Sequence, residues 1–562
     1  MSADLVIKGG TLVDGTGDPG RRGEVAITDG RITEIGTNLS GDKVIDASGQ
    51  IVAPGFIDIH THYDAQVFWD PGLSPSCYHG VTTVVAGNCG FSIAPTRPEH
   101  HELIARTLEN VEDMDVAALA AGIPWDFATF PEYLASVERR GTGLNFAAYI
   151  GHTALRLFVL GDDAYERAST PDEVVQIQAA LREAMLAGAA GFATSFAITH
   201  RGVDGKPVPS RFSDRTEFEA ILDVMREVGR GVVSIAPGQQ CGIADMYELQ
   251  PKTGVPFTYG ALLTSPTGQH RQQIELNHAG WSNGAQVWPQ ITPRPLVFAL
   301  TLAAPFTFNM NSNFAELMGK DIPERREAYA NASWRAKVMA EWDANPGFTV
   351  PRWETFDIAQ SPAHPELEGR MVSELARERG VSPFDVLLDL ALAEPDLALR
   401  ARCILANDDV DEVAALLSEP HCAVGLSDAG AHVSQLCDAP QATDLLGNWV
   451  RGRKAISLEM AVRKLSGAQA DMLGLPDRGY LRTGMCADVV VFDADTVAPG
   501  AIRRVRDFPA NSERLTADNP TGVQHVLVNG TPIRADGQQV NTGLRPGHLV
   551  RPAARQLARG AQ

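Results

Sequence analysis

Two histidines, His60 and His62, stand two positions apart directly after the apolar residues 51–59. Side chains i and i+2 of a β-strand point to the same side, and neutral imidazole is a common ligand of zinc and similar metals. Both side chains of such a pair could therefore bind the same metal ion. The pair alone is a weak signal of a metal site. Whether it is one depends on where its strand lies in the fold and on which residues lie at the ends of the neighbouring strands.

Eight short apolar segments alternate with helical segments through the chain, which is typical of a parallel β/α architecture. This pattern predicts an α/β fold, a (β/α)8 TIM-type barrel, whose active site lies at the carboxyl ends of the strands. Polar residues gather at those ends: His60, His62, Cys89, His152 and Asp428. The predicted strands are 51–59, 81–89, 145–152, 191–195, 231–236, 255–259, 286–291 and 422–428.

Both ends of the chain carry short strands with tight turns, such as the hairpin signal Asp29-Gly30. We expect a small β-sandwich domain built from both termini. The stretch from about 298 to 419 is too long for one crossover helix, which predicts a subdomain inserted over the barrel mouth. The expected boundaries are 1–53 and 476–545 for the sandwich, 54–475 for the metal-dependent barrel with its insertion, and 546–562 for a tail.

The composition of the 562 residues is that of an ordinary globular protein, with 44% hydrophobic and 21% charged residues. A net charge of −21 argues against nucleic-acid binding. Seven cysteines without Cys-x-x-Cys spacing indicate a reducing compartment. The first residues show no basic leader before an apolar stretch, and no apolar run reaches membrane-spanning length. We therefore expect a cytoplasmic protein without membrane contact.

The ordered motifs resemble the amidohydrolase superfamily over nearly the whole chain. They are the opening residues 5–17, then Pro54-Gly55-Phe56-Ile57-Asp58-Ile59-His60-Thr61-His62, and late in the chain residues 484–492. Gly87-Asn88-Cys89-Gly90, residues 151–156 and Leu426-Ser427-Asp428-Ala429-Gly430 resemble its D-aminoacylase (N-acyl-D-amino-acid deacylase) branch. The resemblance implies a barrel with a flanking β-sandwich, zinc-assisted amide hydrolysis, and metal ligands at His60, His62, Cys89 and Asp428.

The sequence departs from that branch at strands five and six, where the resemblance implies one histidine each. Residues 234–238 and 257–261 contain no histidine. The nearest candidate, His278, falls on the helix predicted after strand six, near a helix end at Ala279-Gly280. It would be a ligand only if that segment were a strand. The simplest expectation is a site for one zinc ion or another divalent metal.

Two of the implied ligands also have structural alternatives. Asp428 could cap the following helix, but a buried carboxylate is costly unless it is paired or bound to a metal. We favour a ligand that also shuttles a proton from metal-activated water to the leaving nitrogen. Cys89 could be a small buried residue, although its place at a strand end favours a thiolate ligand.

Three further groups are candidates for substrate contacts. His152 could orient the substrate or polarise its carbonyl as a catalytic residue, or bond a loop carbonyl. His432, four residues after Asp428, could line the mouth or bind metal. A substrate carboxylate calls for a bidentate arginine; Arg294 is the best single candidate, with Arg156, Arg201 and Arg211 as others, although a structural ion pair is the alternative for each.

The resulting hypothesis is a metal-dependent hydrolase of C–N bonds, most like an N-acyl-D-amino-acid deacylase. Its partners would be a small substrate, an N-acyl amino acid or related amide, and further copies of the chain in a homo-oligomer. Two alternatives stay open. One is hydrolysis of a cyclic amide, lactone or carbamate on the same scaffold. The other is a metal-poor relative that only binds a ligand, which the missing histidines favour and the four retained ligands oppose.

Overall fold

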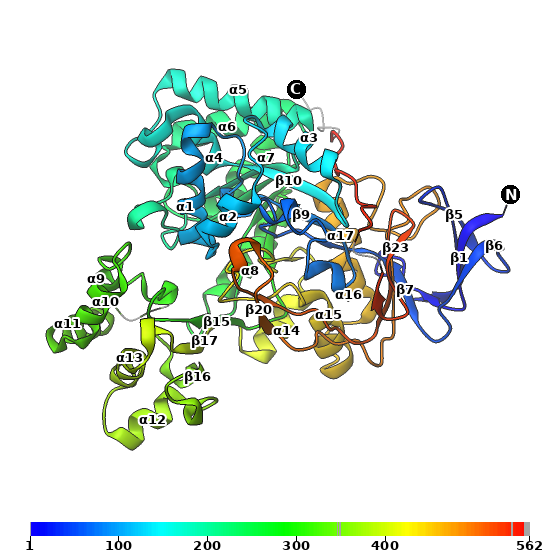
Figure 1. Ribbon diagram of the computed structural model, residues 1–562. Coiled ribbons are helices and arrows are strands. Elements are labelled where there is room, and N and C mark those ends of the chain that lie inside the picture. Colours follow the sequence, from blue (N-terminus) through cyan, green and yellow to red (C-terminus); the bar gives the residue numbers. More distant parts are fainter. Residues whose placement is uncertain (1, 346, 348–349, 541–542, 556–562) are drawn as a thin grey trace.

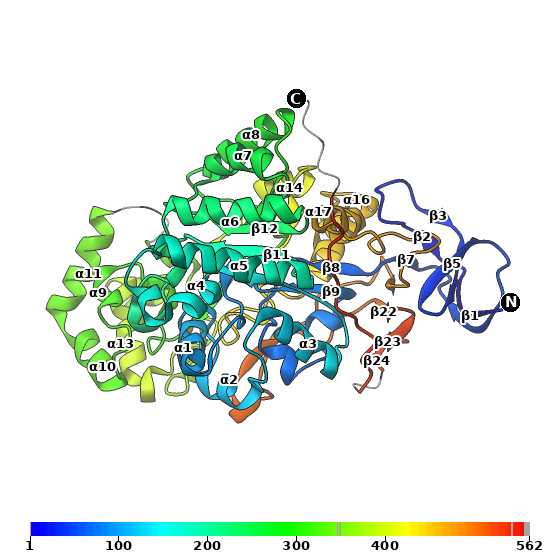
Figure 2. The same ribbon diagram turned by 90° about the horizontal axis from the view of Figure 1, so that it is seen from above.

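The structure is a computed structural model that describes residues 2–345, 347, 350–540 and 543–555. A barrel of strands and helices lies between two outlying parts, a group of strands near the N-terminus and a mainly helical insertion (Figures 1 and 2). Within the described part of the chain, every helix is too short or too polar to cross a bilayer.

The centre of the molecule is a curled parallel sheet of eight strands, in the order β18-β14-β13-β12-β11-β10-β9-β8. Its edge strands meet just beyond their ends, where Thr61 bridges Ala429 and the His62 N–H donates to the Ala429 carbonyl at 2.8 Å. This is the predicted (β/α)8 type of architecture. The strands are β8 (Phe56–Asp58), β9 (Val81–Ala86), β10 (Asn145–Gly151), β11 (Gly191–Ser195), β12 (Val232–Ala236), β13 (Phe257–Tyr259), β14 (Val287–Ile291) and β18 (Ala423–Val424).

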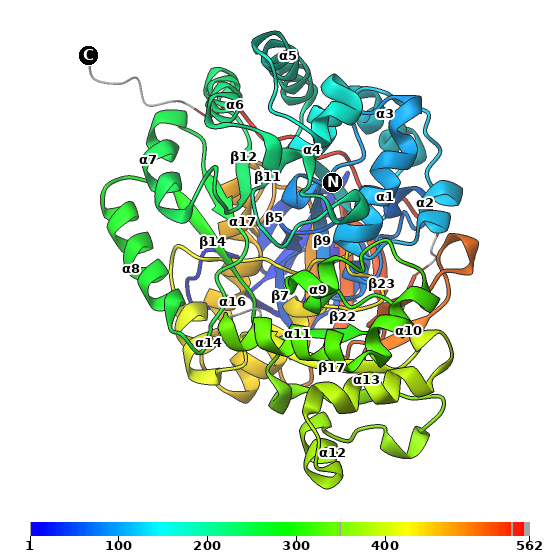
Figure 3. The same cartoon turned by 90° about the vertical axis from the view of Figure 1, so that its left-hand side faces the viewer.

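The barrel strands are buried on both faces, as parallel strands covered by helices must be. Every residue of β9 and β12 is buried, and β-branched valine, isoleucine and threonine predominate in them. Helices surround the strands (Figure 3). They include α3 (Phe130–Arg140), α4 (His152–Leu160), α5 (Pro171–Ala187), α6 (Arg215–Val228), α7 (Ile243–Thr253), α8 (Gln269–Ser282), α14 (Val410–Ser418), α16 (Leu458–Leu465) and α17 (Gly467–Leu473).

The apolar run 51–59 forms two strands instead of one. Gly55 separates β7 (Ile51–Pro54) from β8, and a Cβ at this position would lie 2.2 Å from Thr82 Oγ1. Only glycine allows so close an approach to β9. The chain can therefore leave the outer sheet and enter the barrel within one residue, immediately before the histidine pair.

Strands from both ends of the chain share one sheet, in the order β24-β23-β22-β19-β7-β2-β3. A second sheet, β5-β4-β1-β6, packs its apolar side chains with those of the first: Ile7 and Val25 share a core with Val489 and Val491. The strands are β1 (Ala3–Lys8), β2 (Thr11–Leu12), β3 (Arg21–Arg22), β4 (Glu24–Thr28), β5 (Arg31–Gly36), β6 (Gly41–Asp46), β19 (Val489–Phe492), β22 (Val523–Val528), β23 (Thr531–Ala535) and β24 (Gln538–Gln539).

The stretch between the seventh and eighth barrel strands has a hydrophobic core of its own, which includes Phe314, Tyr329 and Phe384. Its described residues combine the antiparallel sheet β15-β17-β16 with five α-helices. Its elements are β15 (Leu296–Leu300), α9 (Ser312–Ala315), α10 (Ile322–Ala330), α11 (Ala332–Ala344), β16 (Asp357–Gln360), α12 (Val372–Arg379), α13 (Pro383–Ala393) and β17 (Arg400–Ala406). The Phe298 ring packs against the His432 ring, with centroids 5.2 Å apart, so this part reaches the strand ends.

The last described residues run back along the barrel. The Gly547 N–H donates to the Thr142 carbonyl and the Val550 N–H to the Phe146 carbonyl, each at 2.8 Å. The beginning of the expected tail therefore packs on the start of β10, whereas residues 556–562 lie outside the described residues.

Candidate metal centre and active site

Four side chains meet at the carboxyl ends of the barrel strands. One donor atom each of His60, His62 and Cys89 lies within 4.8 Å of the others. Cys89 Sγ is 3.7 Å from His60 Nε2. Asp428 Oδ1 is 3.1 Å from His60 Nε2 and 3.8 Å from His62 Nε2. The structure thus brings together the four residues that the resemblance implies as metal ligands.

The turn after β9 places Cys89 beside the histidines. The Asn88 side-chain amide donates to the carbonyl oxygens of Ile59, Thr61 and Val85 at 3.2, 3.2 and 2.9 Å. These bonds tie the end of the first barrel strand to the end of the second. Gly87, at φ 80°, permits the turn, because a Cβ there would lie 2.4 Å from the Tyr149 carbonyl oxygen.

Three residues at this edge have a left-handed backbone, which is uncommon outside glycine: Cys89 at φ 55°, Asp428 at φ 44° and His432 at φ 46°. Such conformations cost of order 1–3 kcal/mol each and cluster at functional sites. Their occurrence together here indicates that the surrounding structure fixes the directions of these side chains.

The acidic and basic side chains of the cluster stabilise one another's charged forms and so shift one another's pKa values. Burial opposes a charge on His60, but Asp428 outweighs it and raises the pKa of His60 to about 9. Burial raises the pKa of Asp428, yet His60 and His62 hold it well below its usual range. Burial likewise opposes the Cys89 thiolate, but the two histidines lower the pKa of Cys89 to about 7. Asp428 is therefore ionised at neutral pH, and Cys89 is readily ionised.

The other ring nitrogen of each histidine has a polar neighbour, a hydrogen-bond partner for His60 and an acid at ion-pair distance for His62. His60 Nδ1 lies 2.5 Å from Gln290 Oε1, and the Gln290 amide donates to Thr258 Oγ1 at 3.1 Å. His62 Nδ1 lies 3.1 Å from Glu112 Oε1, at the end of α1 (His101–Glu112). A partner on the second nitrogen fixes the tautomer and orientation of a metal-ligating histidine. Both Nε2 atoms therefore face Asp428 and Cys89.

The donor set fits a zinc ion. Imidazole nitrogen, thiolate and carboxylate oxygen are the ligands that zinc takes in proteins, and tetrahedral zinc separates its ligand atoms by about 3.3–3.8 Å. The observed separations of 3.1, 3.7 and 3.8 Å lie close to this range. The side chains of His60 and His62 are 4% and 3% exposed and that of Asp428 is 19% exposed, so the cluster opens to solvent on the Asp428 side.

Comparison with known proteins identifies the family. The model of the amidohydrolase family matches residues 43–534. The chain belongs to the amidohydrolase family. As a member, it is a metal-dependent hydrolase of amide-type C–N bonds.

Relatives of this amidohydrolase match it over nearly their whole length. N-acyl-D-glutamate deacylase of Alcaligenes xylosoxydans xylosoxydans is 30% identical, with 98% of this chain and 96% of the relative covered. D-aminoacylase of the same organism is 29% identical, with 98% of each covered. Among solved structures, N-acyl-D-glutamate deacylase from Bordetella bronchiseptica, complexed with zinc and a phosphonate mimic of the tetrahedral intermediate, is 28% identical with a TM-score of 0.66. It covers 98% of this chain and 100% of its own.

A further solved structure bears on the number of metal ions. It is a D-aminoacylase with a binuclear metal centre, described by one-metal activation and second-metal attenuation. It is 25% identical to this amidohydrolase, with a TM-score of 0.68, and the match covers 98% of this chain and 100% of that one.

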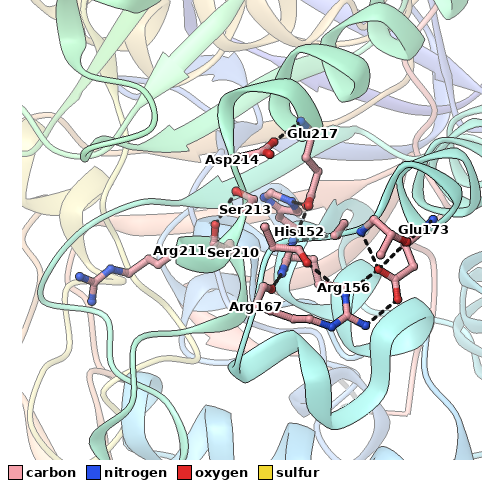
Figure 4. A network of polar contacts seen from close by, with 12 residues as sticks. His152, Arg156, Arg167, Glu173, Ser210, Arg211, Ser213, Asp214 and Glu217 are labelled. Carbon is pink, nitrogen blue, oxygen red and sulfur yellow. Dashed lines mark hydrogen bonds and ion pairs between the residues drawn. The ribbon is translucent and has the colours of Figure 1, made fainter.

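His152 and Arg156 lie in a buried network of polar contacts around Glu217 (Figure 4). His152 Nε2 is 2.7 Å from Glu217 Oε1 and Nδ1 is 2.8 Å from Thr194 Oγ1. Arg156 pairs with the other Glu217 oxygen and donates to the Arg167 carbonyl at 2.7 Å. Both ring nitrogens of His152 are engaged, so the structure does not present this ring to a substrate.

The structure also places the other candidates. Arg294 lies between two acids, with Nε 2.6 Å from Asp438 Oδ1 and Nη1 3.2 Å from Asp444 Oδ1. His432 lies close to the cluster, because its N–H donates to the carbonyl of Glu112 at 2.5 Å. Burial lowers the pKa of His432 to about 4. His278 lies on α8, where its half-exposed ring pairs with Glu419 at 2.6 Å. As expected, β12 and β13 bring no histidine.

Sequence reasoning missed Glu112, Gln290 and His200. Glu112 stands in Glu112-Asp113-Met114-Asp115, which reads as a solvated acidic stretch, yet it is 3% exposed. His200, after β11, bonds Ser195 Oγ at 2.6 Å and packs on Phe91. Burial, with His432 and His62, lowers the pKa of His200 to about 3. No local pattern marks these residues, although Gln290 stands one residue before the end of a predicted barrel strand.

Proposed function

We propose that this amidohydrolase deacylates N-acyl amino acids, with N-acyl-D-amino acids as the first class to test. The observation that carries the proposal is the convergence of His60, His62, Cys89 and Asp428 at the strand ends, with Asp428 accessible. The deacylase relatives, which match the chain end to end, supply the substrate class and the D configuration.

The four cluster residues would hold one zinc ion. When bound, zinc polarises an acyl carbonyl and lowers the pKa of water, which provides several kcal/mol of transition-state stabilisation. Gln290 and Glu112 would keep His60 and His62 directed at the metal. A single ion is proposed because strands β12 and β13 contribute no further histidine.

Asp428 is proposed as the proton shuttle. Its carboxylate starts ionised because His60 and His62 hold its pKa low against the effect of burial. It can accept a proton from the attacking water at a carboxylate oxygen and pass that proton to the leaving nitrogen, which then departs as a neutral amine. His432, neutral at pH 7, would contact the substrate beside it.

A substrate carboxylate would meet Arg201 and Arg211 rather than Arg156 or Arg294, whose guanidinium groups are bound to acids. Arg211 Nη1 donates to the His200 carbonyl at 3.4 Å, and Arg201 Nη1 to the Gly205 carbonyl at 3.0 Å. Neither forms an ion pair with a carboxylate among the described residues. The side chain of Arg211 points away from the His152 network (Figure 4).

His152 and Arg156 are proposed to act indirectly. Glu217 joins both to the start of α6, and Ser210 of the connecting segment donates to the Ser195 carbonyl at 2.7 Å. The network would thereby hold the segment between β11 and α6, which carries His200, Arg201 and Arg211.

We also propose that the two sheets from both chain ends form one β-sandwich domain, with the division at 53/54 and 475/476 expected from the sequence. Their shared apolar core supports this division. The separate core of the insertion supports a subdomain at about 298–419. The homo-oligomer expected from the sequence stays a prediction.

The experiment is a panel of N-acetyl-D- and N-acetyl-L-amino acids, assayed for release of free amine by the zinc-loaded protein. We expect turnover on one configuration. Arg211→Met should raise KM for these acids but not for their primary-amide analogues, with Arg226→Met, on the exposed face of α6, as the control. Failure across the panel together with turnover of cyclic amides, lactones or carbamates would replace the deacylase by that alternative. No turnover and no bound metal would leave only a binding role.

A further inference from the structure

A second polar pocket lies apart from the candidate metal centre, between the insertion and a small two-stranded sheet. That sheet pairs β20 (Arg503–Val505) with β21 (Arg514–Thr516). The pocket has a volume of about 440 Å³. Its polar lining consists of Gln360, Arg400, Arg504, Arg506 and Glu513. None of these residues belongs to the cluster around His60 and His62.

Three guanidinium groups of this pocket converge on a single carboxylate. Glu513 Oε1 accepts from Arg504 Nη1 at 2.9 Å and also pairs with Arg400. Glu513 Oε2 pairs with Arg506 Nη2 at 3.2 Å. Three positive charges against one negative charge leave the pocket wall with two positive charges in excess. The side chains of Arg400, Arg504 and Glu513 are 19%, 23% and 20% exposed, so this excess is only partly solvated.

The remaining contacts of the three arginines reduce this excess without removing it. Arg504 Nη2 donates to the Ser434 carbonyl at 2.8 Å, and Arg506 Nη1 to the Asn511 carbonyl at 3.4 Å. Asp113, a buried acid near Arg400 and Arg504, offsets one of these charges. Its carboxylate also accepts from the N–H and hydroxyl of Ser434 at 2.9 and 2.6 Å, and one positive charge stays in excess. Burial and the neighbouring Arg400 lower the pKa of Arg504, as expected for crowded cations.

We propose that this pocket binds a small molecule through an oxyanion group, a carboxylate or a phosphate. Guanidinium groups match the geometry of both groups and bind them through paired, charge-assisted hydrogen bonds. The volume falls in the range of small-molecule sites and exceeds what a bare inorganic anion needs. Pro362, Ala398 and Val505 provide an apolar wall for the rest of the molecule.

The test is calorimetric titration of the full-length, zinc-loaded protein with inorganic phosphate and, separately, with succinate, at constant ionic strength. Arg506→Gln is the main variant because its side chain is 61% exposed and its loss should not prevent folding. Arg504→Gln is the second. The matched control is Arg503→Gln, which removes a neighbouring exposed arginine that pairs with Asp518 outside the pocket.

We expect saturable binding in the wild type and in Arg503→Gln. In Arg506→Gln and Arg504→Gln, Kd should be about tenfold or more higher. Saturation by succinate alone identifies a carboxylate ligand, and saturation by phosphate alone identifies a phosphate ligand. Absence of saturation with both probes would overturn the proposal, as would equal binding by the control and both pocket variants. A lower Tm of the pocket variants without any anion response would show a purely structural ion cluster and would also overturn it.

Discussion

His60 Nδ1 lies 2.5 Å from Gln290 Oε1, so the seventh barrel strand orients a ligand carried at the end of the first. The Gln290 amide is itself fixed, because its nitrogen donates to Thr258 Oγ1 and Thr258 Oγ1 donates to the Trp288 carbonyl at 2.8 Å. His60 therefore keeps its Nδ1 proton on Gln290 and directs Nε2 at Asp428 and Cys89. The resemblance implies a sixth-strand histidine; here that strand supplies Thr258 to this outer layer instead.

Replacing Gln290 by leucine removes the acceptor for His60 Nδ1. Zinc affinity is expected to fall about 10–100-fold, the usual cost of losing such a partner. Competition with a chromophoric chelator measures it. The control is Gln286→Leu, an exposed residue immediately before the same strand. Equal affinities of the two variants would refute the orienting role.

Glu112 should matter in the same way for His62, whose Nδ1 it faces at 3.1 Å. Glu112→Gln weakens the partner without changing its size, so we expect a 10–100-fold loss of zinc affinity or activity. Glu109→Gln, an exposed acid one turn earlier on α1, serves as the control. If Glu112→Gln binds zinc as tightly as that control, Glu112 does not support the site.

Asp428→Asn separates metal binding from proton transfer. The amide oxygen can still face His60 and His62, but it cannot take up a proton at neutral pH. We expect the variant to retain zinc while kcat falls about 10²–10⁴-fold. Asp172→Asn, on the exposed first turn of α5, should keep both properties. A kcat near that of the wild type would exclude the shuttle.

Glu217 should be important for stability rather than chemistry, since it pairs in a buried site with both His152 and Arg156. Glu217→Gln leaves the Arg156 charge without its partner, and we expect a loss of about 3–5 kcal/mol in urea unfolding at pH 7. Glu219→Gln, which loses an exposed pair on the same helix, should cost less than about 1 kcal/mol. Equal losses would contradict this role.

The contribution of Glu217 to stability is expected to depend on pH. Burial raises the pKa of Glu217, but His152 and Arg156 outweigh it and lower the pKa to about 2. A folded-state pKa below that of the unfolded chain gives stability that is present above about pH 4.5 and is lost as pH falls toward 2. The difference between wild type and Glu217→Gln should therefore shrink over this window. A constant difference would contradict the ionised pair.

Sequence patterns predicted the barrel strands because each is a short apolar run, buried on both faces, that ends in a turn or polar residue. Strand ends gathered His60, His62, Cys89, Asp428 and also His152, and the resemblance to the D-aminoacylase branch selected the four that meet. The sequence patterns missed that 51–59 breaks at Gly55, since the break depends on the approach of Thr82. They also missed Glu112 and His200, which come from a helix end and a loop. Arg156 and Arg294 were expected to bind substrate, but they pair with acids distant in sequence. No local pattern reveals those partners.

Metal analysis of three proteins decides whether His60 and its neighbours hold one zinc ion. Wild type, His60→Ala and His278→Ala are each loaded with zinc, freed of excess metal and assayed for zinc per chain. His278 is the matched control, a half-exposed histidine on α8. We predict about one zinc per chain in wild type and His278→Ala, and close to none in His60→Ala. Retention of zinc by His60→Ala, or a wild type that binds none, would rule out a zinc site built on His60.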